Sequence, residues 1–150
     1  ALEFPQAVSA LGHRGEGLTT EVWWSPFHPF SSGLTKQTSK ELADEYEKTT
    51  SRPWTMPLAF KHSLFEVAIN ALRNSANPLD AASVRDALKA TDYNSVVGNI
   101  NFSKGPVPNI AKTALVGGQW FKGAKGLELG IIENAQVKDC PVNREMTLLG

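Results

Sequence analysis

Residues 15–26 read GEGLTTEVWWSP and carry the clearest change of backbone preference in the chain. The glycines and charged residues at the start favour a turn, whereas the β-branched and aromatic residues from Leu18 to Trp24 favour a strand. Because side chains alternate across a strand, Trp24 shares a face with Val22, and Trp23 points to the opposite face. Trp24 is therefore predicted to lie in the core.

Outward from this strand, the sequence predicts a run of helices followed by a run of short strands. A short helical segment at 4–11 precedes the strand, and a loop with two prolines follows it at 25–33. Three helices are predicted from a capping box, from apolar residues at three- and four-residue spacing, and from an aspartate N-cap; they span 39–49, 57–74 and 80–90. Strand candidates follow at 95–97, 99–102, 113–116 and 127–132. From Lys138 onward no periodic pattern is present, and an irregular strap or loose end is predicted.

Composition and charge limit the possible partners. The chain has 150 residues, with 15 Lys and Arg against 15 Asp and Glu, so its formal net charge is +0. Without a basic excess, a general role in binding nucleic acid or an anionic membrane surface is disfavoured. Length alone predicts one domain. The single cysteine, Cys140, excludes an internal disulfide and a cysteine-based zinc cluster, and it is predicted to be a free thiol in a polar tail.

The sequence contains none of the usual catalytic motifs. It has no nucleophile elbow, Walker loop, zinc-protease helix motif or dinucleotide glycine motif. His13, His28 and His62 are scattered, with no pair at the spacing that places two metal ligands on one helix face. Lys61 and Glu66, five residues apart, do not share a helix face either. We therefore predict no catalytic residue, no cofactor and no metal site, and we do not expect an enzyme.

Aromatic residues gather where the strand meets the loop. Within eight positions lie Trp23, Trp24, Phe27, His28 and Phe30. One interpretation is packing, with an aromatic loop covering the edge of a core. The other is one wall of a cleft that holds a small solute by stacking and apolar contact. Trp23 is the better cleft candidate because it shares its strand face with the charged Glu21.

Several stretches, taken in order, resemble one protein family. They read GEGL at 15–18, EVWWSP at 21–26, ELADEYEK at 41–48, FEVA at 65–68, VRDALKAT at 84–91 and GGQW at 117–120. No single stretch is specific, but their shared order over roughly residues 12–125 resembles the substrate-binding proteins of ABC transporters, in the branched-chain amino acid (leucine, isoleucine and valine) class.

The resemblance implies an α/β protein with the type I periplasmic-binding-protein fold, in which three crossing segments join two Rossmann-like lobes. This chain would be a C-terminal fragment, with the first lobe and most of the second preceding Ala1. By analogy, the chain would divide into the end of the second lobe at 1–21, a crossing at 22–26, part of the first lobe at 27–100, a return crossing at 101–105, and the terminal strands and tail of the second lobe at 106–150.

The family's principal amino-acid contacts lie on earlier loops and have no counterpart in this sequence. The ligand-binding residues expected by analogy lie near the two crossings; they are Trp23, His28 and Phe102. The hinge residues expected at the crossings are Val22, Trp24, Ser25, Pro26, Asn101 and Ser103.

The resemblance implies a periplasmic protein that captures a solute between its lobes and delivers it to an ABC permease in the membrane. The aromatic segment 23–28 favours an aromatic or related organic acid over an aliphatic amino acid. Two alternatives stay open: a ligand-sensing domain of the same fold in a receptor or regulator, and an enzyme whose nucleophile lies outside this sequence. The start of the chain resembles no leader, so any export signal is absent or already removed. A fragment of this kind would expose apolar surface and sheet edges, so self-association is predicted.

Overall fold

The computed structural model describes residues 4–124 and 126–148, and the chain divides into two compact units. Unit 1 comprises Ala1–Pro29, Lys40–Met56 and Ala114–Gly150, and unit 2 comprises Phe30–Ser39 and Pro57–Thr113. Among the described residues the strands form two separate sheets, one in each unit. The structure therefore does not have the single domain predicted from length, because each of the two compact units has a sheet of its own. The predicted lobe boundaries stay a prediction; segment 27–100 runs through both units.

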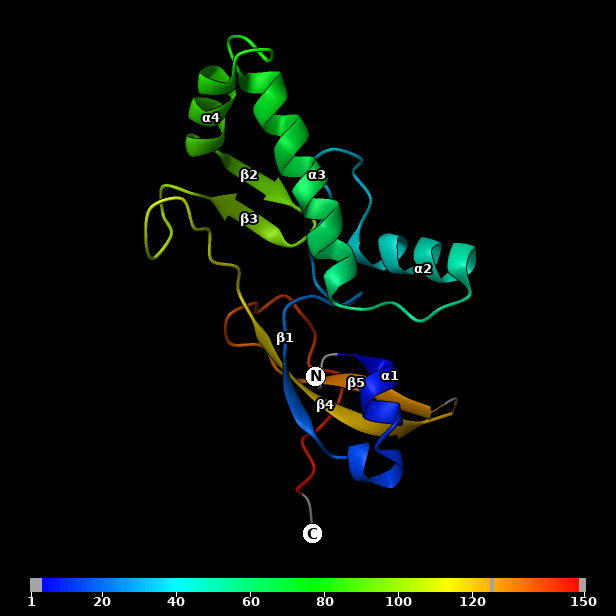
Figure 1. Cartoon of the computed structure of the whole chain (residues 1–150). Helices are drawn as coiled ribbons and strands as arrows, with labels where there is room; N and C mark the ends of the chain where they lie inside the picture. Colours follow the sequence, from blue (N-terminus) through cyan, green and yellow to red (C-terminus); the bar gives the residue numbers. More distant parts are fainter. Residues whose placement is uncertain (1–3, 125, 149–150) are drawn as a thin grey trace. The chain divides into compact units, whose positions relative to one another are not determined.

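Unit 1 is built on a three-stranded antiparallel sheet in the order β1-β4-β5 (Figure 1). β1 (Thr19–Val22) pairs with β4 (Val116–Gly123), which in turn pairs with β5 (Gly126–Glu133). The short helix α1 (Pro5–Ser9) packs against β5, and a 3-10 turn (Gly12–Gly15) follows it. Most of α2 (Ser39–Thr50) also belongs to this unit.

The core of unit 1 includes residues at and beyond the end of β1, where it pairs with β4. Val22 and Trp24 are fully buried, as the alternation of the strand predicts for both. A Cβ at Gly118 would lie 2.5 Å from Val22 Cγ2, so only glycine lets β4 approach β1 this closely. The ring of Trp54 meets that of Trp24 in a T-shaped contact, with centroids 5.9 Å apart.

The C-terminal tail is a strap with specific anchors. Asn143 accepts a hydrogen bond from the Ile131 amide at 2.9 Å. Gln119, in β4, exchanges hydrogen bonds with the Thr147 backbone at 2.7 and 2.9 Å. Cys140 is fully buried, and burial raises the pKa of its thiol to about 11. The predicted irregular strap is confirmed, whereas the placement of Cys140 in a polar tail is corrected, because the strap folds that residue inward.

Unit 2 consists of two helices and a β-hairpin (Figure 1). The helix α3 (Pro57–Asn74) packs on α4 (Ala81–Lys89) and on β2 (Asp92–Ser95), and β2 pairs with β3 (Gly98–Asn101). Asp80 caps α4 by accepting from the Ser83 amide at 2.8 Å. The predicted bounds of α3, 57–74, are confirmed. The helix can begin at Pro57 because proline suits the first turn of a helix.

The strand predictions are only partly right. Val96 and Val97 form the turn between β2 and β3 instead of a strand, and both side chains are buried. Their apolar character therefore reflects the packing of this turn and does not indicate a strand. The predicted strand at 113–116 begins only at Val116 and extends to Gly123, through glycines that disfavour a strand in isolation. Pairing with β1 and β5 on both edges overrides that local preference.

Candidate functional site

The segment from Val22 to His28 lies within unit 1 and contains two of the predicted ligand-binding residues. Trp23 is half-buried, and its indole nitrogen donates to Glu21 Oε1 at 3.1 Å. The tryptophans therefore differ as predicted: Trp24 fills the core, and Trp23 keeps part of its ring at the surface. A partly exposed indole held by a neighbouring carboxylate is a suitable platform for stacking.

His28 lies in a loop but is buried, with only 4% of its surface exposed. Its Nδ1 accepts from the Ser25 amide at 3.0 Å and lies 3.0 Å from Ser25 Oγ. Burial lowers the pKa of His28 from 6.5 to about 4, so the ring is neutral near pH 7. It cannot then supply a positive charge to a bound carboxylate, and any contact with a ligand uses the ring as a neutral group. Ser25 and Pro26 act here as parts of a tight turn.

Phe102, the third predicted ligand-binding residue, belongs to unit 2. It follows β3, and its amide donates to the Thr91 carbonyl at 3.3 Å. The next turn is fixed by Asn101, whose Oδ1 accepts from the Ser103 amide, the Ser103 hydroxyl and the Lys104 amide at 2.9, 2.7 and 3.1 Å. The predicted hinge residues Asn101 and Ser103 are thus joined directly to each other.

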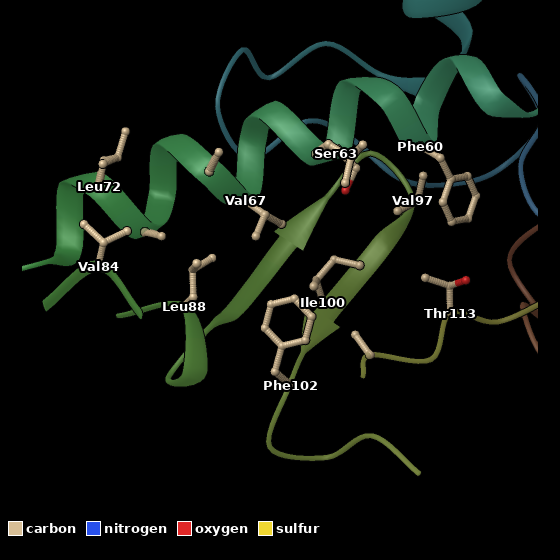
Figure 2. Close-up of a pocket in the computed structure, with 14 residues that line it drawn as sticks. Phe60, Ser63, Val67, Leu72, Val84, Leu88, Val97, Ile100, Phe102 and Thr113 are labelled. Atoms are coloured by element: carbon tan, nitrogen blue, oxygen red, sulfur yellow. The ribbon is translucent and has the colours of Figure 1, made fainter. Parts of the chain in front are cut away.

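The Phe102 ring lines an apolar pocket of about 600 Å³ in unit 2 (Figure 2). In Figure 2, Phe60, Val67 and Leu72 project from α3, and the rings and methyl groups of Val84, Leu88, Ile100 and Phe102 lie across the pocket from them. The pocket has 14 lining residues, and its only polar side chains are those of Ser63 and Thr113. Such a wall offers apolar contact but no group to orient a charged solute. This pocket was not predicted from the sequence, although the apolar stripe of α3 indicated an apolar face at this position.

A buried carboxylate, Glu66, organises the other side of α3. Glu66 is 1% exposed and accepts from Ser32 Oγ at 2.8 Å, the Val96 amide at 3.0 Å and the Tyr93 hydroxyl at 3.4 Å. Burial, and next the Glu66 carboxylate itself, raise the pKa of Tyr93, so the phenol remains a donor. Glu66 was not identified from the sequence as a functional residue.

The neighbouring His62 creates a serine, histidine and carboxylate cluster, but its geometry is not that of a catalytic triad. The same ring nitrogen, Nε2, lies 3.3 Å from Ser32 Oγ and 4.0 Å from Glu66 Oε2. A triad uses the two ring nitrogens for separate partners. Ser32 Oγ donates directly to Glu66 and accepts from the backbone of the loop that follows it. The cluster therefore anchors the loop at 32–35 to α3. The i, i+4 spacing of His62 and Glu66 was the sequence signal that could have revealed it.

The structure describes residues 4–124 and 126–148. No group of three or more His, Cys, Asp or Glu side chains there could hold a metal ion. No helix within residues 4–124 and 126–148 is both long and apolar enough to cross a membrane.

Comparison with known proteins identifies the fold. The sequence matches no family model, and no curated protein matches it significantly. The leucine-binding protein LivK of Thermotoga maritima does match in structure, with a TM-score of 0.66 and 16% identity over 89% of this chain and 35% of that chain. A solute-binding protein of an ABC transporter from Rhodopseudomonas palustris BisB5, in complex with 3,4-dihydroxybenzoic acid, matches with a TM-score of 0.66 and 19% identity over 90% of this chain and 35% of that chain.

A second R. palustris ABC-transporter solute-binding protein, in complex with benzoate, gives a TM-score of 0.55 at 14% identity over 87% of this chain and 35% of that chain. The chain has the type I periplasmic-binding-protein fold. It spans about a third of the length of these solved chains. Within the periplasmic-binding-protein fold, Trp23 and His28 belong to unit 1 and Phe102 to unit 2. At these identities the likeness shows the fold.

Proposed function

We propose that this chain is part of the extracytoplasmic solute-binding component of an ABC importer. The observation that carries the proposal is the fold shared with three solute-binding proteins, over nearly the whole of this chain. The protein captures its solute between two lobes and presents it to a membrane permease, and it acts in the periplasm. This role requires binding and release of a solute and no covalent chemistry. The cluster of Ser32, His62 and Glu66 therefore has a structural role only.

The proposed ligand is an aromatic or related organic acid. Two of the matched proteins hold benzoate or 3,4-dihydroxybenzoic acid, and the third is named as a leucine-binding protein. In this chain, the partly exposed indole of Trp23 favours a planar ligand that stacks. His28 and Phe102 are proposed as further contacts of neutral and apolar character. Residues 22–26, with Asn101 and Ser103, are proposed to bend as the lobes close.

The test is isothermal calorimetry on the complete gene product with benzoate, 3,4-dihydroxybenzoate, leucine, isoleucine and valine. We expect one of the aromatic acids to bind, and Trp23→Ala to weaken it about 3- to 10-fold, as loss of one aromatic contact implies. Phe27→Ala is the matched control, since Phe27 is 40% exposed in the same segment and is not a proposed contact.

Binding of the aliphatic amino acids alone would refute the aromatic ligand while leaving the transport role intact. Binding of none of the five, together with turnover of any of them, would refute the transport role itself. An equal effect of Trp23→Ala and Phe27→Ala would remove Trp23 from the site.

A further inference from the structure

An aromatic groove of about 500 Å³ lies within unit 1, and all 11 residues that line it belong to that unit. Trp120 of β4 and Leu129 of β5, which pair with each other, line it from the sheet. Phe27 and Trp54 line it from two separate loops. A hollow of this size, with aromatic rings from three parts of the chain, suits a small organic molecule.

The aromatic rings of the groove are held in place. The ring of Trp54 meets the buried Trp24 ring in the T-shaped contact, and its backbone amide donates to Glu47 Oε1 at 3.0 Å. The backbone amide of Phe27 donates to Ser25 Oγ at 3.3 Å. Phe27 remains 40% exposed, so a ligand can reach its ring. A ligand that enters the groove therefore has little ordering of the protein to offset.

A glutamate supplies the charge of the groove. The residues that line it include Glu47 and Glu128 but no Lys, Arg or His. Glu128 pairs with Phe121, on the face of the sheet opposite to Trp120, so its side chain points away from the groove. Glu47 is therefore the charged side chain at the groove.

These features select one class of ligand. An aromatic face and a carboxylate both attract a cation, and both repel an anion. A neutral molecule would displace water from the Glu47 carboxylate without compensating its charge. Seven of the lining residues are Phe, Trp, Pro or Leu, which favours methyl groups over N–H donors. A bare metal ion lacks ligands, because the described residues form no group of three or more His, Cys, Asp or Glu side chains that could hold one.

We propose that the aromatic groove binds a small organic cation of the alkylated ammonium class. The rings of Phe27 and Trp54 contact its alkyl groups, and the Glu47 carboxylate neutralises its charge. None of the three residues proposed above as contacts of the aromatic acid lines this groove. The cation site is therefore additional to the proposed solute site, and the inference does not rest on the transport role.

Titration of the 150-residue chain with choline, followed by tryptophan fluorescence, tests the proposal. Trp54 and Trp120 line the groove, so a bound ligand should change their emission. The comparison ligand is the neutral isostere in which a carbon atom replaces the ammonium nitrogen of choline. We expect choline to bind about tenfold more tightly than the isostere, because only choline carries the charge. Sodium chloride at the same ionic strength is the control for screening.

Variants at the groove test its residues one by one. Glu47→Gln keeps an acceptor for the Trp54 amide but removes the charge, and it should weaken choline binding about 3- to 5-fold. Glu45→Gln is the matched control, since Glu45 is exposed on the same helix and lies outside the groove; it should leave choline binding unchanged. Phe27→Ala should weaken choline binding about 2- to 5-fold, whereas Trp23→Ala should not. Circular dichroism of each variant checks that the chain still folds.

Any one of three results would overturn the proposal. One is equal affinity for choline and its neutral isostere, which would show that the groove does not recognise charge. Another is an equal effect of Glu47→Gln and Glu45→Gln. The third is the lack of any saturable fluorescence change with choline. Benzoate binding is measured in a separate titration, so failure of the proposed transport role leaves this test unaffected, and failure of this test leaves the transport role in place.

Discussion

Glu66 is a charged residue on α3 whose hydrogen bonds reach two other segments of unit 2. It holds the loop at 32–35 through Ser32 and the β2–β3 turn through the Val96 amide. A buried carboxylate is tolerated only when its oxygens are satisfied, and here each oxygen accepts a hydrogen bond. The periodicity of the helix predicts that position 66 lies on a helix but not what it touches, because its three donors, Ser32, Tyr93 and Val96, come from elsewhere in the chain.

Glu66→Ala should therefore destabilise unit 2 strongly. It leaves the Val96 amide and the Ser32 hydroxyl without their acceptor, and we expect a loss of about 3 kcal/mol in the free energy of unfolding. Glu66→Gln keeps the shape and one acceptor and should lose about 1 kcal/mol. Urea denaturation followed by circular dichroism measures both. Glu128→Ala, at an exposed position, is the control; a loss as small as in this control would mean that the Glu66 hydrogen bonds contribute little.

His28 makes the stability of the protein depend on pH. Its pKa in the folded state, about 4, lies below the ordinary value of 6.5, so the folded state binds fewer protons than the unfolded state. Stability should thus be full above pH 6.5 and fall as the pH is lowered toward 4, by roughly 3 kcal/mol from this residue.

The measurement is the urea midpoint at several pH values between 4 and 7, for the natural protein and for His28→Gln. The glutamine variant cannot titrate, so its midpoint should fall less steeply over this range. His13→Gln, at an exposed position, should follow the natural protein. Parallel curves for the natural protein and His28→Gln would show that His28 is not buried in its neutral form.

At the scale of elements, helices were easier to predict than strands. Pro57, Asp80 and the apolar spacing of α3 are local signals, and they place α3 and α4 correctly. β4 was predicted only at its first residue because its Gly117 and Gly118 lack any strand preference. Its formation depends on pairing with β1, where Gly118 gives Val22 the room it needs.

β4 also anchors the tail through Gln119, which is 1% exposed. Its Nε2 donates to the Gly17 and Thr147 carbonyls, both at 2.7 Å, and its Oε1 accepts from the Thr147 amide. Gln119→Leu removes these bonds, and we expect hydrogen exchange at the Thr147 amide to accelerate about tenfold or more. Gln6→Leu, at an exposed position, is the matched control. Unchanged exchange in Gln119→Leu would show that the strap is held by other contacts.

At the scale of the whole molecule, the exposed apolar residues predict the behaviour of the isolated chain. The exposed apolar side chains of α3, namely Leu64, Phe65 and Leu72, and the edges of the two small sheets resemble surfaces that proteins usually cover. We expect the 150-residue chain by itself to self-associate at micromolar concentration. Sedimentation velocity measures this, and Leu64→Lys should shift the distribution toward monomer while Leu79→Lys should not. A clean monomer of the natural chain under these conditions would contradict the expectation.

Local sequence patterns were sufficient to predict the three longer helices, the burial of Trp24 opposite Trp23, and the resemblance of the ordered motifs to the ABC substrate-binding proteins. These features depend on local spacing and on alternation, which any short stretch of chain carries. Tertiary contacts were needed to fix the extent of β4, the burial of Glu66, His28 and Cys140, and the exposure of Leu64 and Phe65. Each of these depends on which distant residues meet, because strand pairing, desolvation and the covering of a helix face are set by partners far apart in the chain or outside it.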